Sequence, residues 1–269
     1  MILEVFRINN QQLTINNQQF MNAYVKHNIQ EGIATIEFFH PEQNSLPGAI
    51  LAQLANTITE VGNKEEVKVI ILQSGGDRTF CAGASFKELI AIDDAATGKV
   101  FFSGFANVIN AMRKCPKFII GRIQGKTVGG GVGIAAATDY CMATQFAAIK
   151  LSELNVGIGP FVVSPAIERK LGVSATSQIA IDANSFYDAK WAKEKGLFAN
   201  VYESIEALDE AVLAFAKHLC TYNPEAMLEM KKIFWRGTED WDNLLAERAA
   251  ISGRLVLSEF TKETLKKFK

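Results

Sequence analysis

The amino-acid sequence predicts an α/β protein built around a largely parallel β-sheet. Two runs, VKVIILQS (67–74) and KFIIGRIQG (117–125), are rich in β-branched residues and almost continuously apolar, as expected for parallel strands that are covered on both faces. A segment with apolar residues at helical spacing, VFFSGFANVINAMRK (100–114), lies between them. Strands that alternate with helices are typical of βαβ units and of a parallel sheet.

Length and composition favour one main domain. The chain has 269 residues, of which 48% are hydrophobic and 21% charged, so it can bury a substantial core. No Pro-, Gly- or Ser-rich linker divides its middle. Residues 1–22 contain two Asn/Gln-rich stretches and are expected to form a polar N-terminal extension, because such a segment buries little apolar surface.

Short strands and a helix open the main domain, which is expected to cover residues 23–200. The runs AYVKHNI (23–29) and IATIEFF (33–39) lie on either side of Glu31 and Gly32, and this pattern predicts a β-hairpin. The segment AILAQLANTITEVG (49–62) carries apolar residues at helical spacing and is predicted to be a helix that ends near its glycine.

Residues 201–269 are expected to form a helical C-terminal region. Apolar residues recur there at helical spacing in the segments ALDEAVLAFAKHLC (207–220), PEAMLEMKKIFW (224–235) and WDNLLAERAAISGRLVLSEFTKETLKKF (241–268). A helical region of this kind either covers the core or joins subunits.

Composition argues against several classes of partner. A formal net charge of -1 provides no general attraction to nucleic acids or to anionic membranes, so a small molecule is the expected partner. The chain shows neither a signal-peptide pattern nor an apolar run of membrane-spanning length, and a cytoplasmic location is therefore expected. The four cysteines and three histidines show no metal-ligand spacing, so we expect reduced thiols and no metal site.

Two turns at strand ends are candidates for a binding site. Small residues occupy 81–85 after the first apolar strand, and Gly129, Gly130 and Gly131 follow the second. Small side chains leave backbone N–H groups accessible, and parallel sheets bind ligands at the carboxyl ends of their strands. Two such turns can direct two amides at one oxygen, as in an oxyanion hole. The alternative is that each glycine cluster only allows a helix to pack closely on a strand.

Three linked segments carry motifs that resemble those of the crotonase (enoyl-CoA hydratase/isomerase) superfamily. FCAGASFKEL (80–89) is similar to the family pattern F-(C/S/A)-A-G-A-(D/S)-x-(K)-E, and IQGKTVGGGVGIAAATDYCMA (123–143) to its triple-glycine motif. IKLSELNVGIGPFVVSPAIERKLG (149–172) resembles the family's F-x-x-x-E-x-x-x-G-(I/L)-x-P segment. The resemblance extends from about Ala23 to Lys269. Its motifs are most similar to those of 3-methylglutaconyl-CoA hydratase-like members.

The resemblance implies a fold, an assembly and a set of binding groups. The fold is a crotonase-like spiral of ββα repeats with a C-terminal helical trimerisation region, assembled as a homotrimer or homohexamer. The ligand is an acyl-CoA thioester, so coenzyme A is part of the substrate and no separate cofactor is expected. The backbone amides of Ala84 and Gly130 are expected to hold the thioester oxygen, and the carbonyl of Ala82 the adenine. Gly129 and Lys87 are further candidates for substrate binding.

The resemblance also implies a catalytic acid, with one departure from the family pattern. Hydratases of the family use two acidic residues. The second is present here as Glu153, whereas Gly133 occupies the position of the first. Glu153 is therefore expected to act alone, and the missing side chain at Gly133 is hypothesised to make room for a branch or a carboxylate on the substrate.

Three functions remain open at this stage. The first is reversible hydration of a short or branched 2-enoyl-CoA, such as 3-methylglutaconyl-CoA. The alternatives are a Δ3-Δ2-enoyl-CoA isomerase, which needs only one carboxylate, and a noncatalytic acyl-CoA-binding homologue. A dinucleotide-binding fold and a serine hydrolase are poorly supported, because the chain lacks both the GxGxxG spacing and a GxSxG elbow.

Overall fold

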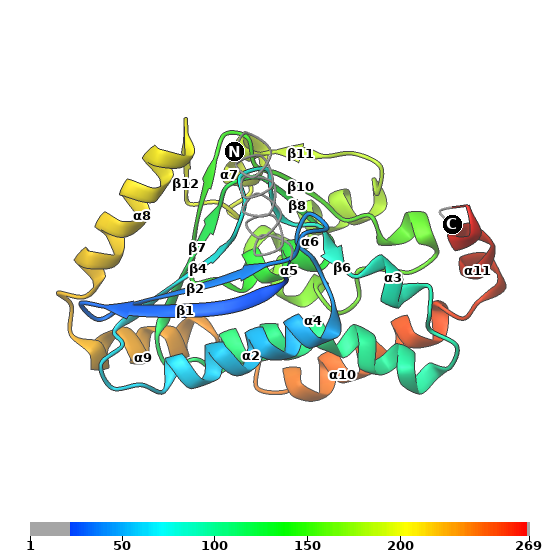
Figure 1. Ribbon diagram of the computed structural model, residues 1–269, viewed down its shortest axis with the longest axis horizontal. Helices are drawn as coiled ribbons and strands as arrows, with labels where there is room; N and C mark the ends of the chain where they lie inside the picture. The colour runs from blue at the N-terminus through cyan, green and yellow to red at the C-terminus, as the bar shows by residue number, and fades with distance from the viewer. Residues whose placement is uncertain (1–21, 268–269) are drawn as a thin grey trace, which may run out of the picture.

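A computed structural model of the protein describes residues 22–267. A six-stranded sheet forms its centre, in the order β1-β2-β4-β7-β9-β12, with helices on both sides (Figure 1). The strands are β1 (Tyr24–Gln30), β2 (Ile33–Phe39), β4 (Val69–Ser74), β7 (Phe118–Ile123), β9 (Tyr140–Thr144) and β12 (Asn200–Tyr202). All neighbouring pairs except β1-β2 are parallel, which confirms the predicted α/β class.

The predicted hairpin is present as β1 and β2. Glu31 and Gly32, between the two strands, both have positive φ angles, of 52° and 81°. Positive φ at both central residues is the geometry of the two-residue turn that best matches the twist of antiparallel strands. The expected polar extension, apart from residue 22, lies outside the described residues.

The central strands are buried on both faces, as their apolar sequences predict. Ile70 and Leu72 of β4 belong to the large core on one face, with residues of the helices α2 (Gly48–Gly62) and α4 (Ala95–Lys114). Val69 and Ile71 face the opposite way and pack against α8 (Ile205–Leu219). Side chains alternate between the two faces of a strand, so a strand between two helical layers must be apolar throughout.

Two smaller sheets were not predicted individually, and they carry the segments with the glycine motifs. A four-stranded sheet has the order β11-β10-β8-β5, and β3 pairs with β6 in a sheet of two strands. These strands are β3 (Ser45–Leu46), β5 (Thr79–Cys81), β6 (Gly83–Ala84), β8 (Lys126–Val128), β10 (Ala148–Lys150) and β11 (Tyr187–Asp188).

Further helices connect and cover these sheets. They are α3 (Phe86–Leu89), α5 (Gly130–Ala137), the 3-10 helix η1 (Glu153–Val156), α6 (Ser164–Ile181), α7 (Ala189–Glu194), α9 (Pro224–Phe234), α10 (Trp241–Leu255) and α11 (Glu259–Lys266). No helix in the described part of the chain is long and apolar enough to cross a membrane.

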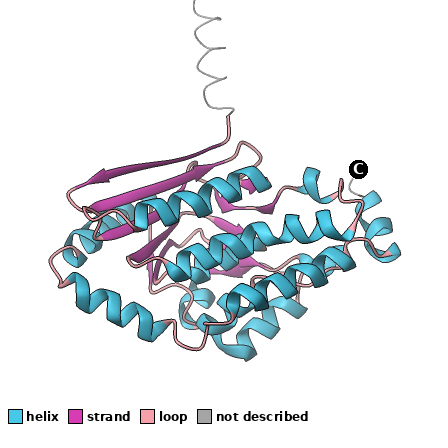
Figure 2. Ribbon diagram, turned by 90° about the horizontal axis from the view of Figure 1, so that it is seen from below, coloured by secondary structure: helices cyan, strands magenta, loops and turns pink. Residues whose placement is uncertain are grey.

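The C-terminal helices are part of the main core. Trp235, Trp241 and Leu245 belong to the same buried cluster as the central strands, and β12 crosses the boundary expected between core and helical region. The last predicted helical segment is divided in two, because the Ser258 side chain caps α11 by accepting a hydrogen bond from the Thr261 N–H. The helices α2, α4 and α10 lie stacked on one side of the sheet (Figure 2).

Helices α4 and α10 cross at unusually close range. A Cβ atom placed on Gly98 would lie 2.8 Å from the Cα of Gly253. Glycine at both positions therefore allows the two backbones to touch, and this contact holds the C-terminal region against the core.

Candidate active site

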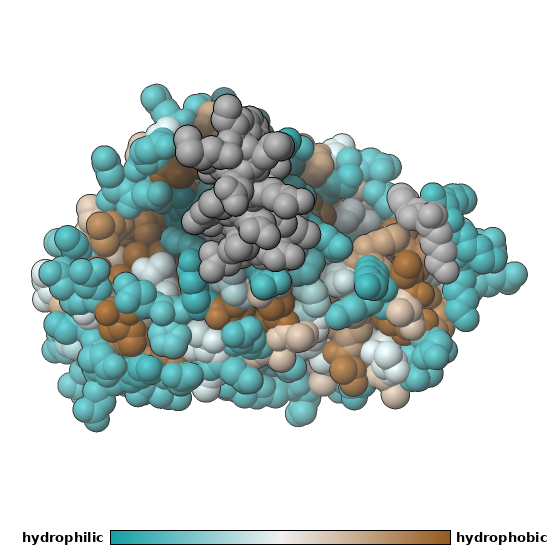
Figure 3. Space-filling model, in the orientation of Figure 1, coloured by the Kyte–Doolittle hydropathy of each residue, from teal (hydrophilic) through white to brown (hydrophobic). Residues whose placement is uncertain are grey.

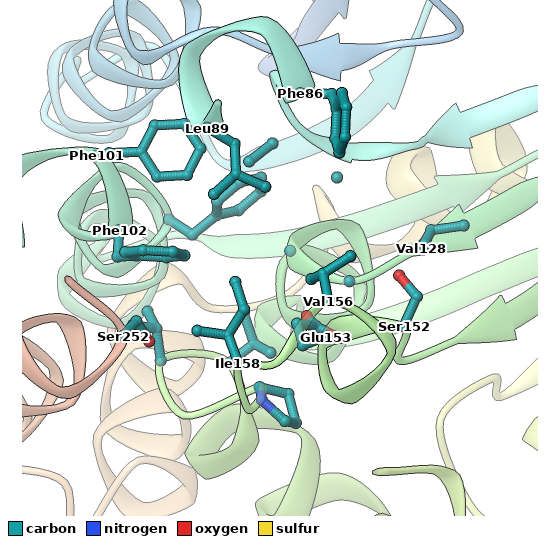
Figure 4. A pocket seen from close by; sticks show the side chains of 18 of the residues that line it. Phe86, Leu89, Phe101, Phe102, Val128, Ser152, Glu153, Val156, Ile158 and Ser252 are labelled. Atoms are coloured by element: carbon teal, nitrogen blue, oxygen red, sulfur yellow. The ribbon is translucent and has the colours of Figure 1, made fainter. Parts of the chain in front are cut away.

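A cavity of about 460 Å³ lies where the β5-β6 turn, the β8-α5 turn and η1 meet helix α4. Figure 4 shows its side chains converging from these separate segments. The cavity thus brings together the three motifs that the sequence singled out.

On the surface, hydrophobic side chains gather on the side of the molecule near α3 and α11, at the right of Figure 3.

The two glycine- and alanine-lined turns lie next to each other. A Cβ atom placed on Gly83 would be 3.4 Å from the Val128 carbonyl oxygen and 4.0 Å from the Gly130 nitrogen. The cavity is lined by both Ala84 and Gly130. The two turns are therefore neighbours on the cavity wall.

Local structure leaves the Ala84 and Gly130 amides without a partner within their own elements. Ser85 N–H donates to the Leu46 carbonyl of β3, at 3.0 Å, and successive amides of an extended strand point to opposite sides. The Ala84 N–H therefore points away from β3. Gly130 is the first residue of α5, and the first amides of a helix have no acceptor within it.

Glycine is required at both positions of the second turn. Gly129 has a φ angle of 53°, and a Cβ atom there would lie 3.0 Å from Oε1 of Glu153. A Cβ atom on Gly130 would come within 2.3 Å of the Phe105 ring. The turn therefore contacts the Glu153 carboxyl group directly, and a larger residue would displace it.

Glu153 carries a carboxyl group with an unusual environment. The residue as a whole is of intermediate exposure, but its Oε2 atom is buried and has no hydrogen-bond partner among the described residues. Burial raises the pKa of Glu153 to about 7, although the backbone amides of Glu153 and Ser152 act in the opposite direction. A carboxyl group with this pKa exchanges a proton readily at neutral pH.

The rest of the wall is mostly apolar, and the sequence did not reveal it. Phenylalanines from α3, α4 and the segment before α6 surround the cavity, namely Phe86, Phe101, Phe102, Phe105 and Phe161. Val156 and Ile158 lie beside Glu153 (Figure 4). The spacing of Phe101 and Phe105 indicates one face of a helix, but no signal in the sequence says what that face lines.

Polar groups on the wall are few. Glu42 and Glu153 are the only charged side chains that line the cavity in the described part of the chain. Ser45, Ser152 and Ser252 are the others with polar side chains. Ser252 comes from α10, so the C-terminal helical region, which the sequence associated with covering the core or with assembly, also contributes to this wall.

Five of the predicted site residues share the cavity wall, and two do not. Ala82, Ala84, Gly129, Gly130 and Glu153 all line it. Lys87 does not; its side chain is exposed on the short helix α3.

Gly133 lies behind the cavity wall and leaves no space for a substrate. It is buried in α5, and a Cβ atom there would lie 2.6 Å from Cγ1 of Val163 and 3.4 Å from Cδ1 of Ile109. The expectation that Gly133 makes room for a branch or a carboxylate is therefore wrong, because Val163, itself a lining residue, already fills that room.

Cysteine, histidine and acidic residues do not form a metal site within residues 22–267, since no three of them are grouped suitably. The four cysteines are unpaired, and three are buried. Burial raises the pKa of both Cys81 and Cys141 to about 12, so these thiols are neutral near pH 7.

Comparison with known proteins gives a family match that spans most of the chain. The family described as "Enoyl-CoA hydratase/isomerase" matches residues 28–268. The protein named "Methylglutaconyl-CoA hydratase, mitochondrial" from Homo sapiens is 29% identical over 201 residues, which is 73% of this chain and 59% of that protein. This chain thus matches only about three fifths of the length of that relative.

A bacterial relative and a solved structure match over more of their length. The "Probable enoyl-CoA hydratase" of Bacillus subtilis (strain 168) is 26% identical over 247 residues, covering 89% of this chain and 93% of that protein. The crystal structure of enoyl-CoA hydratase from Bacillus halodurans superposes with a TM-score of 0.85 at 22% identity, covering 91% of this chain and 99% of that one. The superposition on the solved structure establishes the fold.

Proposed function

The chain belongs to the enoyl-CoA hydratase/isomerase family, and we propose that it catalyses the reversible hydration of a short or branched 2-enoyl-CoA. One observation carries the proposal. The cavity brings the backbones of Ala84 and Gly130 together with a single buried carboxyl group whose Oε2 has no hydrogen-bond partner in the described chain.

Glu153 is the proton carrier in this proposal. As a carboxylate it removes a proton from water while the water oxygen bonds to the β-carbon of the substrate. The π electrons move to the thioester oxygen, and the N–H groups of Ala84 and Gly130 stabilise the resulting enolate. The carbonyl then re-forms as the proton on Glu153 passes to the α-carbon. A pKa of about 7 for Glu153 suits a group that must both accept and donate this proton.

The acyl group is the less determined part of the substrate. The human relative named a methylglutaconyl-CoA hydratase makes 3-methylglutaconyl-CoA the first compound to test. The wall is aromatic and aliphatic and includes no Lys, Arg or His from residues 22–267. A carboxylate on the acyl group would have to be paired by a group outside this wall, because an unpaired buried carboxylate is costly. An uncharged acyl group needs no such partner.

Isomerisation of a 3-enoyl-CoA to a 2-enoyl-CoA is the second candidate, and Val163 is the observation that favours it. Val163 fills the space beside Gly133, so the position at which two-acid hydratases carry their first acid holds no carboxyl group here. A lone carboxylate is sufficient to move a proton from the α-carbon to the γ-carbon through the same enolate.

Activity assays on a small panel of thioesters distinguish the candidates. The panel contains 3-methylglutaconyl-CoA, 3-methylcrotonyl-CoA, which has the branch without the charge, crotonyl-CoA and a 3-enoyl-CoA. Hydration is followed by loss of the conjugated enoyl absorbance, and isomerisation by its appearance. We expect hydration of at least one 2-enoyl-CoA, and a loss of kcat of roughly 10²- to 10⁴-fold in Glu153→Gln.

A matched control is Glu168→Gln, which removes an exposed carboxylate from α6 and should leave kcat unchanged. Turnover of the 3-enoyl-CoA alone would establish the isomerase instead. Binding of the thioesters without turnover of any of them would identify a noncatalytic acyl-CoA-binding protein. We further propose assembly as a trimer or a pair of trimers, which light scattering on the purified protein tests.

A further inference from the structure

A second cavity, of about 310 Å³, shares no residue with the first. Asp139, Arg169, Lys170 and Phe234 line it. They come from the α5-β9 junction, from α6 and from the end of α9. Helix α9, which ends at Phe234, lies at the opposite end of the molecule from α11 (Figure 1).

The carboxylate in this cavity, that of Asp139, already has hydrogen-bond partners on both of its oxygens. Oδ2 of Asp139 accepts hydrogen bonds from the Lys231 ammonium and from the Ile119 N–H, both at 2.8 Å. Oδ1 accepts from Nε1 of Trp235 at 3.0 Å. The side chains of Asp139 and Lys231 are only 7% and 3% exposed. Lys231 therefore balances the charge of Asp139.

Two further cations are left without a carboxylate. The Arg169 guanidinium lies over the Trp235 ring, 4.1 Å from its centre. The Lys170 ammonium donates to the backbone carbonyl of Asp139 at 3.2 Å. No carboxylate in residues 22–267 is within ion-pair distance of either group. Burial is the main influence that lowers the pKa of both side chains, and the charge of Asp139 acts in the opposite direction on both, so each is partly removed from water without a carboxylate of its own.

Adjacent cations in a partly desolvated cavity repel each other and favour an anion between them. A guanidinium offers a planar fork of donors that fits the oxygens of a carboxylate or a phosphate, and an ammonium adds a point charge. We propose that the cavity between Arg169 and Lys170 binds a small free oxyanion that bears a carboxylate or phosphate group. Such an anion joins α6 to α9, through Arg169 and its contact with Trp235, and stabilises the folded protein.

Trp235 provides a reporter for this site. The chain has three tryptophans, and Trp235 and Trp241 are in contact, with ring centres 5.8 Å apart. In a Trp191→Phe background, fluorescence therefore comes from this pair alone. Inorganic phosphate and acetate are titrated at constant ionic strength, with chloride as the reference anion. We expect a saturable fluorescence change and a higher Tm with phosphate or acetate, and neither with chloride.

Variants assign the response to the two cations. Arg169→Gln and Lys170→Gln should each weaken phosphate binding by tenfold or more. Lys232→Gln, which changes an exposed lysine on the same helix as Phe234, should leave it unchanged. Circular dichroism checks that each variant is folded. Lys170→Arg keeps the charge and should retain phosphate binding, and it provides the test of Lys170 if Lys170→Gln proves unstable.

Three outcomes would overturn the proposal. One is a response to chloride equal to that of phosphate, which indicates screening only. Another is an unchanged phosphate affinity in both glutamine variants. The third is a change of oligomeric state in these variants, measured by light scattering, without any phosphate binding by the unmodified protein, because the cations would then serve a contact between subunits.

Discussion

The carboxyl group of Glu153 is held in a site that disfavours its charge. One oxygen lies against Gly129, and the other is buried and has no hydrogen-bond partner within residues 22–267, while Val156 and Ile158 lie beside the group. Burial stabilises the protonated form relative to the carboxylate. The same residue is the proton carrier of the proposed reaction, so the feature that suits it for catalysis also costs stability.

The loss of stability caused by burial of the Glu153 carboxylate predicts a specific dependence of the free energy of unfolding on pH. The pKa of Glu153 is about 7 in the folded protein against 4.5 as the reference value. Between these values the folded state binds more protons than the unfolded state, so the free energy of unfolding falls as pH rises, by about 3 kcal/mol in total. Glu153→Gln should therefore match the unmodified protein near pH 4.5 and be more stable than it near pH 8. Urea unfolding of both proteins across this range measures the difference.

The comparison between the two proteins cancels the contributions of all other titrating groups. A free-energy difference that stays constant with pH would mean that the Glu153 carboxylate is well solvated in the folded protein, and it would remove the basis for its role as a proton carrier.

Gly133 supports a second prediction at the scale of a single residue. A Cβ atom there would overlap Cγ1 of Val163 at 2.6 Å, in a fully buried part of α5. Overpacking of a filled core costs about 1–3 kcal/mol, so Gly133→Ala should be destabilised by that amount in urea unfolding. Gly48→Ala is the matched control, since the added atom would only reach ordinary contact with Glu88, at 3.6 Å, at the start of helix α2. Equal stability of the two variants would contradict the account of Val163 as the occupant of this space.

Helices α4 and α10 connect the packing of the C-terminal region to the cavity. Gly253 contacts α4, and its neighbour Ser252 lines the cavity. A Cβ atom on Gly253 would lie 2.6 Å from the Lys99 nitrogen, and backbone cannot yield as a flexible side chain does. The position of α10 on α4 therefore sets the position of part of the cavity wall.

A substitution at this crossing should change stability and substrate binding together. Gly253→Ala is expected to lower the free energy of unfolding by about 1–3 kcal/mol and to raise KM for the preferred thioester more than it changes kcat. Ala250→Ser, on the exposed side of the same helix, should do neither. Urea unfolding and steady-state kinetics measure both quantities. An increase in KM without any loss of stability would contradict the coupling through the helix crossing.

The elements that the sequence predicts well are those with a long and repeated pattern. The two strands of the hairpin and the strands that contain Val69 and Ile119 are recognisable because each is six or seven residues long, which is enough to show a pattern. Strands β3 and β6 have two residues each, too few to show any period. Their pairing nevertheless holds Ala84 at the cavity wall, so part of the candidate site depends on structure that no local pattern indicates.

The candidate site divides in a similar way. Ala84, Gly130 and Glu153 could be predicted because each belongs to a motif with fixed neighbours, and the structure brings all three to one cavity. The role of Gly133 was misjudged because its neighbour in space, Val163, is thirty residues away in the sequence. Space left by a glycine is a property of the packed molecule, and the sequence alone does not say which side chain fills it.

At the scale of the whole molecule, the net charge of -1 provides no general attraction for an anionic substrate. Coenzyme A carries three phosphate groups, and the cavity wall adds two carboxyl groups, those of Glu42 and Glu153, with no lining cation in residues 22–267. Glu42 is exposed, which leaves its carboxylate free to act on a ligand at the cavity. Its charge should therefore weaken the binding of CoA esters through repulsion across solvent.

Removing this charge tests the argument with a substrate that lacks the phosphates. Glu42→Gln should lower KM for a CoA ester by a few-fold at low salt, the size typical of solvent-exposed charge interactions, and the effect should shrink as ionic strength rises. The corresponding acyl-pantetheine thioester has no phosphate, so its KM should be the same for both proteins at every salt concentration. An equal fall in KM for the two thioesters would mean that Glu42 acts through contacts with the acyl or pantetheine part. An unchanged KM for both would mean that the phosphates bind beyond the reach of its field.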